Sequence, residues 1–188
     1  MRISPLLATA LLAAPLAAQV PSPDIQIAAA VQPLPEADRA KATVIGYRNY
    51  GRLTVLREGT GPMVCLADDP AAEAWHVACY HKDLEPFMAR GRELEAQGLK
   101  RPAIDSVRLA EITARTLPFP DGPRALINLS APKDSIDAAT GIARSPRRLD
   151  VLYIPYVTGA AVGLPERPGV GPWVMYPGKP WAHLMIMR

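Results

Sequence analysis

The sequence predicts an α+β fold, with two main helices packed on one face of a mostly antiparallel sheet. Segments whose apolar residues alternate with a period of two, as in half-buried strands, precede and follow two segments with helical periodicity. This order of strands, helices and strands is typical of an α+β domain. Proline is frequent, at 21 of 188 residues, which is about twice the usual usage. Because the prolines are spread between apolar segments, they indicate a fold of short elements.

The N-terminal residues 1–18 predict a secretory signal peptide. One basic residue, Arg2, precedes the apolar run ISPLLATALLAAPLAA, which ends in two alanines. The run is shorter than the roughly 20 residues that a membrane-spanning helix needs. We therefore expect cleavage after Ala18 and a periplasmic or secreted product; the alternative is a buried apolar helix. No later apolar run is long enough to span a bilayer, so no stable membrane insertion is expected.

The mature chain is expected to begin with a tether and to continue as one globular domain. Residues 19–23 (QVPSP) form the tether and residues 24–188 form the domain. Asp24 is suited to cap a short helix over IQIAAAV, although the alternation of Ile25 and Ile27 also suits a strand. Another helix is predicted over PEADRAKA, residues 35–42, because proline and acidic residues are favoured at a helix N-terminus.

Two pairs of strands are predicted next. The segments ATVIGY and RLTVLRE have a period of two and are separated by the polar turn RNYG, which indicates a β-hairpin. The short apolar runs PMVCLAD and WHVACYH follow, with the polar segment DDPAAEA between them. We expect this second pair to be antiparallel and to belong to the same sheet.

Cys65 and Cys79 are predicted to form a disulfide. They are the two cysteines of the chain, and disulfides persist in the oxidising compartments that exported proteins enter. A closed loop of about 15 residues stabilises a fold by about 3 kcal/mol in the chain-entropy model. A reactive thiol and a zinc site with His76 and His81 are the alternatives. The zinc site is disfavoured because His76 and Cys79 point to opposite faces if their segment is a strand.

Two longer helices are predicted in the middle of the chain. Asp83 is a suitable N-cap for the segment LEPFMARGRELEAQG, which ends at Gly98. A second helix opens at Pro102 and continues to about Thr116. The apolar face of the first helix consists of Leu84, Phe87, Met88 and Leu94.

The C-terminal part of the chain is predicted to return to the sheet. The segment PFPDGP reads as a linker between elements. After it, RALINLS, LDVLYIPYV and PWVMYPGKPWAHLMIM predict three or four strands, the last two joined around Pro177-Gly178.

Two blocks of the sequence resemble a known group of proteins. They are VLREGTGPMVCLADDP followed by WHVACYHKDLEPFMARGREL, and YIPYVTGAAVGLPERPGVGPWVMYPGKPWAHLMI. Over residues from about 42 to 188, the chain resembles a group of exported bacterial proteins of about this length. The resemblance implies a single exported domain in a bacterial envelope setting. It implies no catalytic residue, so each candidate site rests on side-chain chemistry.

The charge balance disfavours nucleic acid as a partner. Lys and Arg number 21 against 18 Asp and Glu, whereas nucleic-acid binding calls for a clustered basic patch. Arg144, Arg147 and Arg148 do cluster, but the segment TGIARSPRR that contains them predicts a solvated loop.

Motifs for catalysis and metal binding are weak. The nucleophile motif G-x-S-x-G is absent from the sequence, and both cysteines are expected to be oxidised. The segment GTGP at residues 59–62 lacks the lysine of a phosphate loop and predicts a turn. The adjacent Asp68 and Asp69 supply too few oxygen ligands for calcium.

His81 and Lys82 form the first candidate binding site. They directly precede a predicted helix N-terminus, which attracts anions. Together with Arg57 and Glu58 they would line a polar patch. The alternative is an exposed polar collar without a ligand.

The C-terminal hairpin is the second candidate site. Gly and Pro turns with aromatic planes can form a stacking platform for a sugar or a hydrophobic ligand. Alternation within the last strand predicts that Leu184 and Ile186 are buried and that His183 is more accessible, close to an aromatic residue of YIPY. The alternative is a core strand pair filled with aromatic residues. The candidate residues are Tyr156, Trp173, Tyr176, Trp181 and His183.

These observations favour an exported, disulfide-stapled, soluble domain that binds a small ligand or an envelope protein. Neither a cofactor nor a metal is expected. The alternative from another class is a small periplasmic hydrolase or metal-dependent enzyme that uses His81 and His183. A third possibility is a structural factor of the envelope.

Overall fold

A computed structural model describes residues 20–49 and 51–188 of the chain; the predicted signal peptide lies outside these residues. The helices are α1 (Pro23–Ala30), α2 (Glu36–Arg39), η1 (Lys82–Leu84), α3 (Glu85–Ala96), α4 (Arg101–Thr113), η2 (Lys133–Ser135) and α5 (Gly159–Val162). The strands are β1 (Thr43–Asn49), β2 (Arg52–Arg57), β3 (Met63–Leu66), β4 (Trp75–His81), β5 (Arg124–Ala131), β6 (Arg147–Tyr153), β7 (Trp173–Met175) and β8 (His183–Met187).

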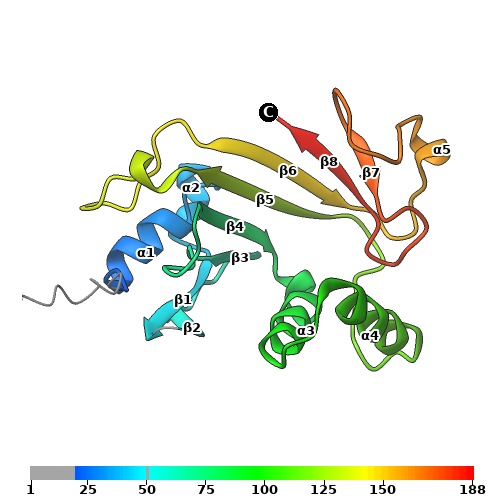
Figure 1. The fold of residues 1–188 in the computed structure, drawn as a ribbon, viewed down its shortest axis with the longest axis horizontal. Helices are drawn as coiled ribbons and strands as arrows, with labels where there is room; N and C mark the ends of the chain where they lie inside the picture. The colour runs from blue at the N-terminus through cyan, green and yellow to red at the C-terminus, as the bar shows by residue number, and fades with distance from the viewer. Residues whose placement is uncertain (1–19, 50) are drawn as a thin grey trace, which may run out of the picture.

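The eight strands form one sheet in the order β2-β1-β3-β4-β5-β6-β8-β7 (Figure 1). Both predicted strand pairs are present, β1 with β2 and β3 with β4, and β7 pairs with β8 as expected. All neighbouring strands are antiparallel except β1 and β3. The predicted α+β class with a mostly antiparallel sheet is therefore confirmed.

The parallel pair arises because the chain crosses the start of β1 between β2 and β3. At this crossing the Gly59 N–H donates to Thr43 Oγ1 at 3.0 Å, and the Gly61 N–H donates to the Lys41 carbonyl at 2.8 Å. A Cβ atom on Gly59 would lie 2.3 Å from backbone atoms of Lys41, Ala42 and Thr43. The crossing is this close because Gly59 has no side chain.

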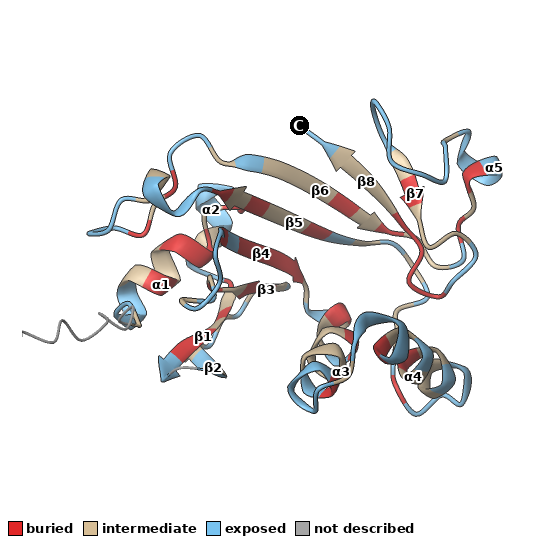
Figure 2. Cartoon of the chain, in the orientation of Figure 1, coloured by how far each residue is buried: buried red, intermediate tan, exposed pale blue. Residues whose placement is uncertain are grey.

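Helix α1 and the pair α3 and α4 lie at opposite ends of the sheet (Figure 1). They pack on opposite faces, because their partners alternate along β3 and β4. The face that we call the α3–α4 face carries a core of Tyr80, Leu126 and Val151, against which Leu84 and Phe87 pack. On the other face, Val31 of the segment after α1 packs on a core that includes Val44. Figure 2 shows the buried residues along β4 and β5 and the exposed outer sides of α3 and α4. The prediction for the two main helices holds. Helix α1 confirms the short helix expected over IQIAAAV and excludes the strand that was its alternative.

The helix starts differ from the prediction in two places. Helix α1 begins at Pro23, so Ser22 and not Asp24 occupies its N-cap position. Asp83 does not cap α3 either, because the chain leaves β4 directly into η1 and Leu84 takes the N-cap position. The Asp83 carboxylate instead accepts a hydrogen bond from Arg124 Nε at 2.7 Å.

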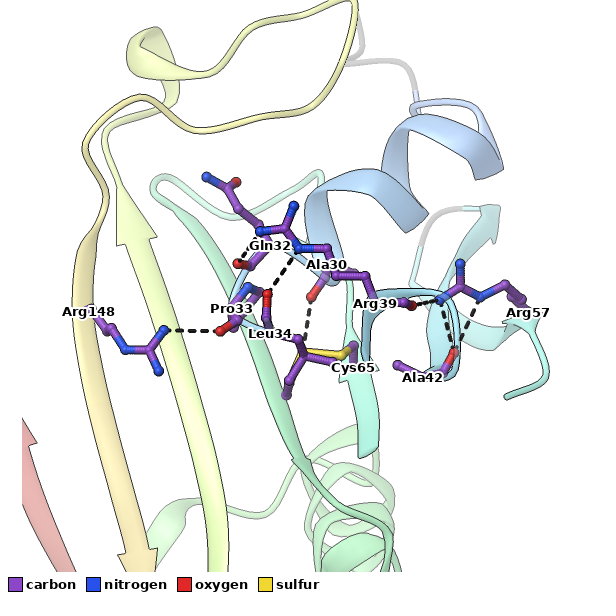
Figure 3. Close-up of a disulfide and its surroundings, with 10 residues drawn as sticks. Ala30, Gln32, Pro33, Leu34, Arg39, Ala42, Arg57, Cys65 and Arg148 are labelled. Atoms are coloured by element: carbon purple, nitrogen blue, oxygen red, sulfur yellow. Dashed lines mark hydrogen bonds between the residues drawn. A yellow bond between two sulfur atoms is a disulfide. The ribbon is translucent and has the colours of Figure 1, made fainter. Parts of the chain in front are cut away.

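The predicted disulfide joins Cys65 and Cys79, which face each other in the register of β3 and β4. Their Cα atoms are 4.0 Å apart, somewhat closer than the roughly 4.5 Å of the closer kind of directly opposed antiparallel pair. Both residues are fully buried, and Cys79 Sγ lies 3.2 Å from the Ala30 carbonyl oxygen (Figure 3). The zinc site and the reactive thiol, which both need free thiols, are therefore wrong.

Arginines hold the segment between α1 and α2 over this disulfide (Figure 3). Arg148 Nη1 donates to the Pro33 carbonyl at 3.0 Å, and Arg39 Nε donates to the Leu34 carbonyl at 3.0 Å. Arg148 also pairs with Asp150. Arg147 and Arg148 begin β6, so the prediction of a solvated loop is wrong for both of them.

Candidate functional site

The aromatic residues of the C-terminal hairpin are mostly part of the core. Trp181 and His183 are only 3% and 6% exposed. The Trp181 ring centroid lies 5.6 Å from that of Phe87, and the His183 centroid lies 4.7 Å from that of Tyr153. The expected proximity of His183 to an aromatic residue of YIPY is thus confirmed. The expected accessibility of His183 is wrong.

Burial along β8 follows the position along the strand rather than the face. The register places His183, Met185 and Met187 on the α3–α4 face, whereas Leu184 and Ile186 lie on the other face and are only half-buried. Exposure on the α3–α4 face rises from His183 to Met187, which is 49% exposed. The reason is that the helices cover one end of this face and not the other.

His183 has the features of a satisfied core histidine. Its Nδ1 lies 2.8 Å from the Trp181 carbonyl oxygen. Burial lowers the pKa of the His183 imidazole, because the apolar surroundings disfavour the charged ring. A neutral ring bonded to the backbone serves packing, so His183 has no open access to a substrate.

The structure does not bring His81 and His183 together. Strands β5 and β6 separate β4 from β8. His81 follows Tyr80 and therefore points to the opposite face from the one that carries Tyr80, Tyr153 and His183. His81 Nδ1 accepts the Asp83 N–H at 3.2 Å, and Lys82 is exposed. A shared acid–base or metal site for the two histidines is incompatible with this arrangement.

The polar patch expected around His81 and Lys82 does not include Arg57. Its Nη2 donates to the Ala42 carbonyl at 3.0 Å, which holds it at the β2 edge of the sheet. Strands β1 and β3 separate β2 from β4. His81 and Lys82 therefore resemble the exposed collar that was the alternative.

Tyr156, in contrast, lines a pocket of about 680 Å³ and is 62% exposed. The end of α4, the linker after it, the chain after β6 and the β7–β8 connection together form this pocket. We call it the proline pocket, because four prolines contribute to it. Its lining consists of Ile112, Arg115, Leu117, Pro118, Phe119, Pro120, Asp121, Pro155, Tyr156 and Pro180.

Two lining residues have a left-handed backbone, Arg115 with φ 58° and Tyr156 with φ 62°. This conformation costs an L-residue roughly 1–2 kcal/mol. Backbone hydrogen bonds maintain it: the Tyr156 N–H donates to the Lys179 carbonyl at 2.9 Å, and the Arg115 N–H donates to the Ile112 carbonyl at 3.0 Å. The four proline rings further restrict the backbone of the walls, which favours a pocket that is already formed before a ligand enters.

The lining provides ring faces and two charged side chains. Phe119 and Tyr156 are aromatic, and Arg115 and Asp121 are exposed. The lining contains neither histidine nor serine nor cysteine. Such a surface can stack against a flat ring and form hydrogen bonds at its edge.

The sequence points to Tyr156 but not to most of this pocket. The segment PFPDGP predicts a linker between elements, and nothing in its composition indicates that it faces Tyr156. A left-handed tyrosine has no sequence signature, because the residues favoured in that conformation are Gly, Asn and Asp. Trp173 and Tyr176, the other hairpin candidates, are half-buried and are not among the lining residues.

Within residues 20–49 and 51–188, no helix has the length and apolar character needed to cross a membrane. The same residues contain no cluster of three or more His, Cys, Asp or Glu side chains that could hold a metal ion.

Comparisons of the chain with protein-family models, curated proteins and solved structures return no significant match.

Proposed function

We propose that the protein is an exported, soluble binding domain that takes a small ligand in the proline pocket. The observation that carries the proposal is the exposed, left-handed Tyr156 at a proline-lined pocket of about 680 Å³. Backbone strain of this kind clusters at ligand sites, where the surrounding structure maintains it. The volume lies within the range of roughly 300–1,000 Å³ that is usual for small-molecule sites.

A pocket that is already formed supports binding because little conformational entropy is lost when the ligand arrives. The lining has no histidine, serine or cysteine that could act as base or nucleophile, which favours binding over hydrolysis. The ligand class that suits the lining is a ring with an apolar face, a sugar or an aromatic compound, with polar groups directed to Arg115 and Asp121.

The test uses the mature chain, residues 19–188, in a thermal-shift screen of oligosaccharides and aromatic acids, followed by calorimetric titration of each hit. Tyr156→Gly is the main variant. Glycine tolerates the left-handed backbone, so this variant should fold as well as the wild type or better. It should nevertheless lose at least tenfold in affinity, because the stacking ring is gone.

Tyr176→Gly is the matched control. Tyr176 also has a positive φ, 55°, but its ring packs 6.1 Å from that of Trp181 in the core. This variant should lose stability and keep the affinity of the fraction that remains folded. Hits whose affinity is the same in Tyr156→Gly and wild type would overturn the assignment of the pocket, and a screen without hits would favour an envelope protein as the partner.

Export is the second part of the proposal. The charged start and short apolar run of residues 1–18 support it, and the disulfide supports an oxidising compartment. Intact mass of the protein from a periplasmic fraction should correspond to a chain that starts at Gln19. A full-length mass, or recovery from the cytoplasm, would contradict export.

A further inference from the structure

The α3–α4 face has an uncovered end, and a row of polar side chains crosses it. His76 of β4, Ser130 of β5 and Arg147 of β6 stand opposite one another in the register of three adjacent strands. Neighbours in such a row are about 5 Å apart. Together with Asn128 they line a hollow of about 170 Å³, separate from the proline pocket. We call it the His76 hollow.

The polar groups of the His76 hollow are mainly hydrogen-bond donors. Arg147 is exposed and forms no ion pair with any residue of the described ranges. His76 Nε2 lies 3.1 Å from Asn128 Oδ1, so the Asn128 amide NH₂ is the group that can donate to a ligand. The hydroxyl of Ser130 adds one more donor. No carboxylate belongs to the lining.

The charged side chains near the His76 hollow do not neutralise its positive charge. Arg148 also lines the hollow, but its guanidinium is bonded to Pro33 and Asp150 on the other face. Asp68 lies in the adjoining hollow on the other side of His76. Its carboxylate accepts the His76 backbone N–H at 2.8 Å and lies 3.9 Å from Lys133 Nζ. The unpaired charge at the His76 hollow is therefore that of Arg147.

Apolar side chains lead away from Arg147 toward the edge of the sheet. Leu149 and Met187 line the hollow and stand opposite each other in β6 and β8. The next row on the same face continues through Met185 to Trp173 of β7. Met187 is 49% exposed. Methionine adapts its shape to apolar ligands, so this path suits a flexible hydrocarbon chain.

We infer that the His76 hollow binds the carboxylate of an amphipathic acid, with Arg147, Ser130 and Asn128 on the head group and the hydrocarbon chain over Met187 and Trp173. A carboxylate is an acceptor-only anion and matches a group of donors around one guanidinium. The adjacent apolar path is the reason for proposing a ligand with a hydrocarbon chain rather than a small anion. This site does not depend on the ligand of the proline pocket.

The test is calorimetric titration of the mature chain with hexanoate, octanoate, decanoate and dodecanoate below their micelle concentrations. Affinity should rise by up to about fourfold for each added CH₂ that becomes buried, and level off when the chain reaches the sheet edge. Decanol, which has the same chain without the charge, should bind at least tenfold more weakly than decanoate.

Arg147→Gln should lower decanoate affinity at least tenfold, because it removes a charge-assisted hydrogen bond. Arg147 is an exposed residue at the start of a strand, so this variant should fold normally. Arg52→Gln is the matched control, since Arg52 is an exposed arginine in β2 at the far edge of the sheet. It should bind decanoate as the wild type does.

Three outcomes would overturn the inference. They are equal affinity for decanol and decanoate, equal loss in Arg147→Gln and Arg52→Gln, and affinity that does not change with chain length. Binding of inorganic phosphate or of phosphatidylglycerol vesicles with the same dependence on Arg147, but without binding of the free acids, would assign the hollow to a phosphate group instead.

Discussion

The side-chain amide of Gln26 pairs with the backbone of Tyr47 in both directions. Nε2 donates to the Tyr47 carbonyl at 2.7 Å, and Oε1 accepts the Tyr47 N–H at 2.8 Å. Gln26 is 4% exposed, and a Cβ atom on Gly46 would lie 2.7 Å from its Oε1. The glutamine thus acts as an additional partner for β1, and the absence of a side chain at Gly46 lets α1 dock there.

Replacing Gln26 by Leu should destabilise the fold by about 2–4 kcal/mol, because both backbone groups of Tyr47 would be buried without partners. Urea unfolding followed by circular dichroism measures the change. Gln97→Leu, at an exposed position at the end of α3, should change stability by less than about 0.5 kcal/mol. Equal effects of the two substitutions would show that the Gln26–Tyr47 pair contributes nothing.

The close crossing at Gly59 predicts that Gly59→Ala is destabilising by about 1–3 kcal/mol or more. The added methyl group would meet backbone atoms, which cannot move without shifting β1. Gly169→Ala is the matched control, since nothing lies within 4 Å of its Cβ position and its φ is not in the left-handed range. The melting temperatures of the two variants measure this difference in stability. An unchanged melting temperature for Gly59→Ala would contradict the close crossing.

Loss of the disulfide in the double variant Cys65→Ala, Cys79→Ala should lower the free energy of unfolding by about 2–4 kcal/mol. Both residues are fully buried, so reductant should react slowly with the folded protein and quickly in urea. Thiol titration of the oxidised protein in denaturant should find no free thiol. Two reactive thiols in that experiment would contradict the pairing.

Stability should fall as the pH falls below about 6.5, in part because of His183. Burial lowers the pKa of the folded-state imidazole from its usual 6.5, so between the two pKa values the unfolded state binds more protons than the folded state. Under this condition stability rises with pH. His183→Gln, which does not titrate, should show a smaller loss between pH 7 and pH 5 in urea unfolding. A steeper loss in the variant would mean that the histidine is charged in the folded protein.

Local patterns in the sequence were sufficient for the α+β class, the hairpin of β1 and β2, the cysteine pair and the helices α3 and α4. Each of these follows from neighbours along the chain, as apolar periodicity does, or, for the pair of Cys65 and Cys79, from two cysteines in short apolar runs of a chain that is expected to be exported. The strand pairs that follow one another closely in the sequence are all antiparallel, which is what short connections allow.

Only the tertiary structure determines which residues are buried, which strands pair in parallel and where the pocket forms. Alternation along β8 correctly separates His183 from Ile186 by face, but it carries no information about which segments pack on each face. Tyr153 of β6 and Tyr176 of the β7–β8 connection pack against the His183 ring, which is buried. The parallel β1–β3 pair depends on the crossing at Gly59, and the proline pocket depends on a linker meeting a left-handed Tyr156. Both result from contacts between segments far apart in the chain, which no local period encodes.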